Sequence, residues 1–136
     1  MISLTTAWVW VARLVGVSVF LQSVELLGLR DRFSDAGPWR WSSVQKEPGW
    51  VPRVFNPIFA MPKFLAVPVL QIIFAFGLVL HSNLFFSSSC FFSALLVCMR
   101  WRGTLNGGSD YMTLLVLLCL SVAHASGVES EISQFA

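Results

Sequence analysis

The sequence predicts an all-α protein: an integral membrane bundle of four transmembrane helices with a long interfacial first loop. The chain has 136 residues, of which 56% are hydrophobic and only 12% are charged, about half the charged fraction of an ordinary soluble domain. Its apolar residues form runs close to the roughly 20 residues that cross a bilayer. Because these runs are continuous rather than alternating, they predict helices and exclude a β-barrel.

The positions of the runs set the expected organisation. We expect one membrane domain over residues 1–136, with an interfacial loop over residues 30–57. The expected spans cover residues of about 4–29, 58–80, 84–99 and 111–128. In lipid the backbone must satisfy its own hydrogen bonds, which each helical span does internally.

The first run, over about residues 4–29, predicts a retained transmembrane helix. No Lys or Arg precedes Trp8, the run is longer than a signal-peptide core, and no Ala-x-Ala follows it, so a cleaved signal peptide is excluded. Trp8 and Trp10 fit the aromatic belt at the first membrane interface.

Two charges interrupt this span. Arg13 lies about nine residues in, or roughly 13 Å deep at 1.5 Å per residue, so we expect it to pair between helices or to snorkel, with a direct role at a site as the alternative. Glu25 lies near the other interface, where Arg30 and Arg32 can neutralise it.

The segment from Arg30 to Lys63 is polar, rich in proline and rich in tryptophan, which argues against one continuous helix. Tryptophans interleaved with cations can bind nucleic acid. Beside membrane helices, however, the pattern favours a segment on the headgroup surface, with indoles at the boundary and cations toward lipid phosphate. We therefore expect lipid and no nucleic acid as a partner. The residues assigned to this surface are Trp39, Arg40, Trp41, Trp50, Arg100 and Arg102.

The second span begins at either Ile58 or Phe64, and Pro68 should kink it or mark its true start. In the third span, serines such as Ser87 and Ser93 are small enough to let helices approach closely in lipid, a packing role that we favour over a catalytic one.

The stretch from Arg100 to Asp110 is the main polar, glycine-rich break in the second half of the chain. Its Asn-Gly-Gly turn predicts a tight connection, after which Ser109 or Asp110 caps the fourth helix. A phosphate cradle is the alternative, but the spacing of a phosphate-binding loop is absent.

Charge predicts the topology. Of nine basic residues, all except Arg13 lie in the first loop, at its borders or in the 100–110 turn, which share one face if there are four spans. The positive-inside rule then places that face in the cytoplasm and both termini outside it. We expect a bacterial inner membrane protein.

The polar candidates for chemistry are Arg13, Glu25, His124 and Asp110, with Arg13 and His124 expected at similar depth near the outer face. The two histidines, His81 and His124, lack metal-ligand spacing, and axial haem ligation by them stays open but unsupported. We identify no metal site, no cofactor-binding residue and no catalytic residue. The three cysteines fit small apolar fillers.

One motif resembles a known group of families. The stretch Arg102 to Leu115, with its Asn-Gly-Gly-Ser-Asp helix opening, is similar to that of bacterial DoxX-like and HTTM-type membrane proteins, the latter related to the membrane part of vitamin-K-dependent carboxylase. The first span and its exit, from Arg13 to Asp35, also resemble these proteins. The resemblance implies a helical polytopic membrane protein, and for some DoxX relatives thiol, sulfur or quinone redox chemistry, although this chain has no redox Cys pair.

We therefore hypothesise a non-catalytic structural or assembly subunit of a larger membrane complex, with other membrane subunits as partners. The small size, the serine-rich third span and the lack of a catalytic constellation motivate this view. The alternative is a membrane-embedded enzyme or redox partner acting on a lipid, quinone or thiol. A transporter ranks last, because only Arg13 and Gln71 populate the midplane.

Overall fold

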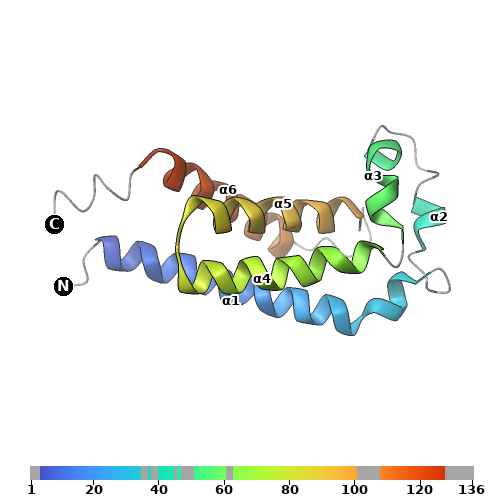
Figure 1. Ribbon diagram of the computed structural model, residues 1–136, viewed down its shortest axis with the longest axis horizontal. Helices are drawn as coiled ribbons and strands as arrows, with labels where there is room; N and C mark the ends of the chain where they lie inside the picture. Colours follow the sequence, from blue (N-terminus) through green and yellow to red (C-terminus); the bar gives the residue numbers. More distant parts are fainter. Residues whose placement is uncertain are drawn as a thin grey trace.

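The computed structural model describes residues 4–34, 37, 40–44, 46, 51–60, 63–100 and 108–127, and every regular element among them is a helix. Four long helices run along the molecule, and four short segments gather at one end of it (Figure 1). The long helices are α1 (Leu4–Gly28), α4 (Ala66–Leu80), α5 (Leu84–Arg100) and α6 (Gly108–Ala125). The short segments are η1 (Arg30–Phe33), α2 (Trp41–Val44), α3 (Val51–Phe59) and η2 (Lys63–Leu65).

The long helices pack in the order α1, α4, α5, α6, each mainly against the next, whereas α1 and α6 touch much less. α1 begins and α6 ends at the same end of the molecule, and α6 crosses obliquely behind α5 (Figure 1). The short segments α2 and α3 lie at the opposite end, where α3 runs crosswise to the bundle (Figure 1). We call this group of short segments, η1, α2, α3 and η2, the cap.

Small residues let α1 and α4 approach closely. The buried positions of α1 repeat every three or four residues, as expected of one helix face. A Cβ added at Gly16 would lie 2.8 Å from Val79 Cγ2 and 3.0 Å from the Ala75 carbonyl oxygen, so only glycine fits there. The buried positions, which we call the inner seam, are Ala12, Gly16, Val19, Ser23 and Leu26.

Buried serines satisfy their hydroxyls within their own helices. Ser23 donates to the Val19 carbonyl at 2.7 Å, and Ser121 donates to the Leu117 carbonyl at 2.8 Å. This bonding removes most of the cost of a hydroxyl away from water. The serines of α5 that the sequence assigns to helix contacts, Ser87 and Ser93, are also buried, so they pack within this chain.

Two helices are long and apolar enough to cross a membrane, over Thr6–Gly28 and Lys63–Leu80. The other two long helices are apolar but shorter, over Leu84–Arg100 and Asp110–Ala125. The all-helical bundle expected from the sequence is thus present, with two helices of spanning character.

The second predicted span is two helices rather than one. α3 ends at Phe59, so Ile58 belongs to the cap, and α4 begins at Ala66 after the 3-10 turn η2. Pro68 lies in the first turn of α4, where its missing N–H is not needed for the helix. Of the two starts weighed from the sequence, the helix begins nearer the later one, Phe64, and Pro68 lies in its first turn rather than at a kink.

The fourth helix also differs from the prediction at both ends. α6 begins at Gly108 and ends at Ala125, three residues before each predicted limit. Asp110 consequently lies inside the first helical turn, where its charge favours the helix dipole, instead of acting as the cap residue. Most of the glycine-rich turn, residues 101–107, lies outside the described residues.

Candidate functional site

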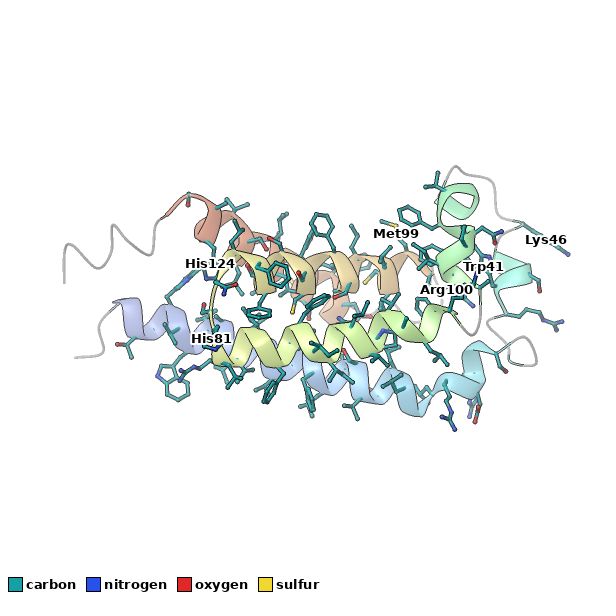
Figure 2. All side chains as sticks on the ribbon, in the orientation of Figure 1. Trp41, Lys46, His81, Met99, Arg100 and His124 are labelled. Atoms are coloured by element: carbon teal, nitrogen blue, oxygen red, sulfur yellow. The ribbon has the colours of Figure 1, made fainter. Side chains whose placement is uncertain are left out.

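The structure brings polar side chains together at both ends of the bundle, around Arg100 at one end and His124 at the other (Figure 2). The first cluster centres on Arg100, in the last turn of α5, whose side chain is 0% exposed. Its Nε donates a hydrogen bond of 3.1 Å to the carbonyl oxygen of Phe59. Its guanidinium carbon lies 5.1 Å from the ring centre of Trp41 and 5.6 Å from that of Phe64. We call Trp41, Phe59, Phe64 and Arg100 the arginine cage.

The aromatic rings of the cage also contact one another. Phe59 packs edge-to-face on Trp41 at 5.1 Å between ring centres and on Phe64 at 6.2 Å, and it stacks with Phe55 at 5.5 Å. The Trp41 indole N–H donates to the side-chain oxygen of Asn56. Since these residues come from α2, α3, η2 and α5, the cage fastens the cap onto the end of the bundle.

This position differs from the one expected from the sequence. Trp41 and Arg100 were assigned to the headgroup surface, but both are buried against each other where the cap meets the end of α5. A cation that loses its water is stabilised here by two aromatic faces and a carbonyl oxygen, so burial replaces lipid contact. Arg40 is exposed, as expected of a surface residue, whereas Trp39, Trp50 and Arg102 lie outside the described residues.

The surface of the cap and of the segments beside it exposes both apolar and positively charged side chains. On α3, Val54 and Ile58 are exposed, while Phe55 and Phe59 turn into the protein. Arg30 forms an ion pair of 3.9 Å with Asp31, but both side chains are well exposed, so this pair adds little stability. The exposed cations at this end are Arg30, Arg32, Arg40, Lys46 and Lys63.

The second cluster centres on His124, in the last turn of α6. Its Nε2 lies 3.0 Å from Ser82 Oγ and its Nδ1 lies 3.2 Å from Ser87 Oγ. The imidazole also meets the Trp8 ring edge-to-face at 6.1 Å. We call His124, Ser82, Ser87 and Trp8 the histidine cluster; it joins α1, the α4–α5 turn, α5 and α6.

The hydrogen bonds of Ser87 determine the roles in this cluster. The Ser87 hydroxyl donates to the Asn83 carbonyl at 3.0 Å, so it accepts from His124 Nδ1–H. The Nε2 of His124 then accepts from the Ser82 hydroxyl. In this assigned tautomer both ring nitrogens of His124 face serine hydroxyls, and the Ser82–His124 pair matches the orientation in which an imidazole removes a proton from a serine.

Arg13 lies near the level of the α4–α5 turn and not deep between helices. Gly16 packs on Val79 of the antiparallel α4, and Arg13 precedes Gly16 by about 4.5 Å along the helix axis, three residues at 1.5 Å each. That shift carries Arg13 to the level of Ser82. Its side chain is exposed and lies over the ring of Trp10 on the same helix, 5.6 Å from the ring centre.

The four polar residues singled out from the sequence do not form one site. Within the described residues, no hydrogen bond or ring contact links Arg13 to His124. The expected pairing of Glu25 with Arg30 or Arg32 is absent there too, since Glu25 is exposed and Arg30 pairs with Asp31. Asp110, in the first turn of α6, lies near Cys98 of α5.

The serine partners of His124 are the functional residues that sequence reasoning missed. They stand 42 and 37 residues before it, so no local spacing reveals them. The usable signal is topological: a three-residue turn brings Ser82 and Ser87 to the end of the bundle at which α6 finishes.

The described residues hold no group of three or more His, Cys, Asp or Glu side chains that could bind a metal ion. None of the three cysteines forms a disulfide, and Cys90 is buried whereas Cys119 is exposed. His81 is exposed at the same end as His124, whose two ring nitrogens face serines.

Comparisons with family models, with curated proteins and with solved structures find no match to this chain. The class of protein is therefore defined by the fold and by the two clusters alone. It is an all-helical bundle with two helices of membrane-spanning character, closed at one end by an arginine-fastened cap and at the other by a histidine–serine cluster.

Proposed function

We propose that the protein crosses the membrane four times and acts as a non-catalytic structural or assembly subunit of a larger membrane complex. Large apolar side chains are exposed on all four long helices, such as Leu21 on α1, Ile73 on α4, Phe92 on α5 and Leu115 on α6. Lipid is the solvent that such a surface prefers. α5 and α6 have 17 and 18 residues, the lower end of the length that spans a bilayer.

One observation carries the structural role. Two polar side chains, the buried Arg100 and the partly buried His124, contact groups of other helices. Arg100 joins the cap to α5, and His124 joins α6 to the α4–α5 turn. Polar contacts that join helices at both ends of the bundle support a structural role. The serines of α5, which motivated this role in the sequence, no longer support it, because Ser87 and Ser93 pack within the chain.

The same arrangement supports the proposed topology. α1 begins and α6 ends at the end of the bundle opposite the cap (Figure 1). Of the exposed cations among the described residues, all except Arg13 lie at the cap end, so the positive-inside rule favours a cytoplasmic cap and non-cytoplasmic termini in a bacterial inner membrane. A relationship to the DoxX-like and HTTM-type proteins also belongs to this proposal, and it rests on the resemblance of residues 102–115 and of residues 13–35.

The experiment that tests the subunit role is purification of the tagged full-length chain from its native membranes in a mild detergent. We expect defined polypeptides to co-purify in fixed stoichiometry and to be lost in a harsher detergent. A homogeneous solitary protein with a catalytic activity of its own contradicts the proposal.

A second candidate function has one specific observation in its favour. The Ser82 hydroxyl faces His124 Nε2 at 3.0 Å, a pairing that can activate a serine toward a lipid ester at the outer interface. Labelling by a fluorophosphonate that is lost in Ser82→Ala and retained in Ser88→Ala would favour this enzyme. A quinone or thiol reaction finds no comparable pairing among the described residues.

A further inference from the structure

α1 has a second row of residues on the side opposite its inner seam. Leu14, Ser18, Leu21 and Glu25 recur at spacings of four, three and four, and all four are exposed. Leu14 is 65% exposed and Leu21 is 60% exposed. At about 100° per residue, this outer seam faces away from α4. A helix with apolar rows of this spacing on two sides can pack against two neighbours.

Glu25 makes the outer seam unusual for a surface that contacts lipid. Glu25 follows Gly16 by nine residues, about 13.5 Å along the axis, and Gly16 packs on Val79 of the antiparallel α4. Glu25 therefore lies level with Leu70, in the second turn of α4, within the length of the bundle. The carboxylate has no ion pair with any described residue, because the nearby Arg30 pairs with Asp31.

We propose that the outer seam docks a transmembrane helix of another subunit, and that this helix places a Lys or Arg opposite Glu25. Carboxylates inside membrane spans normally pair with protein groups, and lipid chains offer no such partner. Ser18, between the two leucines, allows close approach of the incoming backbone.

The negative charge of Glu25 also favours one kind of partner helix over another. A second copy of this chain inserted with the same topology and paired through the seam would bring Glu25 against Glu25, and like charges repel. A helix with a cation near the cytoplasmic face, where Glu25 lies, is complementary instead. This inference rests on the proposed role as a subunit and adds the surface and the chemistry of its partner.

The experiment uses the full-length chain in phosphatidylcholine vesicles, with the photoreactive residue p-benzoyl-phenylalanine in place of Leu21. The probe is a synthetic Leu/Ala transmembrane helix with one Lys at the depth of Glu25. The control peptide has the same sequence with Leu in place of that Lys. A second preparation places the photoreactive residue at Ile73, which is exposed on α4 outside the seam.

We expect the Lys helix to cross-link at position 21 about threefold to tenfold more than the Leu helix, the range of measured polar contacts between membrane helices. The excess should vanish in Glu25→Gln and be absent at position 73. Equal yields for the two helices, equal yields at the two positions, or cross-linking of two copies without probe would each overturn the inference. Native subunits that co-purify but cross-link only through other faces would sink this inference and leave the proposed function standing. A chain that purifies alone would sink the proposed function.

Discussion

Removal of the Arg100 side chain tests the idea that this residue holds the cap on the bundle. Arg100→Ala deletes two cation–π contacts, each worth about 0.5–2 kcal/mol, and one charged hydrogen bond to Phe59 worth about 1.5–3 kcal/mol. The variant also no longer has the desolvation penalty of a buried guanidinium, which offsets part of this loss of stability. We expect the free energy of cap opening to fall by about 2–3 kcal/mol, which raises the open population by roughly 30-fold to 150-fold.

Lysyl endopeptidase measures this opening directly. The chain contains two lysines, Lys46 and Lys63. Cleavage after Lys63 requires access to Phe64, which is 2% exposed in the closed cap. The initial rate of cutting at this bond, measured by mass spectrometry in detergent micelles, should therefore rise by the same factor in Arg100→Ala. The substitution neither adds nor removes a cleavage site.

Two matched variants make the test specific. Arg100→Lys keeps a cation but loses the planar guanidinium and its Nε donor. It adds a cleavage site at position 100, so only the initial rate at the Lys63 bond is compared, and that rate should rise less, by about tenfold. Arg40→Ala removes an exposed cation of the same segment and should leave the rate unchanged within about twofold. A wild-type rate in Arg100→Ala, or an equal increase in Arg40→Ala, would refute the role assigned to the arginine cage.

Three further predictions follow from helix packing, the histidine cluster and topology. Gly16→Ala should destabilise the bundle by about 1–3 kcal/mol in detergent unfolding, because its Cβ meets Val79 at 2.8 Å; Gly28→Ala, with nothing within 4 Å, should have no destabilising effect. His124→Ala should speed amide exchange in the α4–α5 turn by about tenfold, a loss of roughly 1–2 kcal/mol, and Val122→Ala, on the exposed side of α6, should not. Alkaline phosphatase fused at the C-terminus should be active and fused between α2 and α3 inactive; the reverse pattern would contradict the proposed topology.

The helical class follows from the sequence because it depends on composition and run length, and these are local quantities. Helix starts were harder to predict. Pro68 was compatible with a kink or a start, and only the separate folding of α3 into the cap decides between them. The start of α6 at Gly108 was missed because a glycine-rich turn gives no local mark of the residue at which the helix begins.

The location of Arg100 could not be predicted from the sequence, since its partners are distant. A cation at the end of an apolar run beside tryptophans is typical of an interfacial residue. Here the Phe59 carbonyl, 41 residues away, accepts from it after α3 folds back. His124 is similar, because its serine partners depend on the register between α6 and the α4–α5 turn.

How deeply a charged residue is buried in this bundle depends on where the neighbouring helices end, and not on how far the residue lies from the start of its own helix. Counted from the first residue of α1, Arg13 is deep, yet α4 ends beside it, so its side chain is exposed at the level of the turn. Arg100 and His124 lie in the last turns of their helices. The middle of the described bundle instead buries one amide, Gln71, whose Oε1 finds no hydrogen-bond partner among the described residues. An unsatisfied amide oxygen costs about 1–3 kcal/mol, and a buried charge costs more. The positions of Arg13, Arg100 and His124 fit this difference in cost, because each lies near the end of a helix, where water, headgroups or aromatic rings reach it.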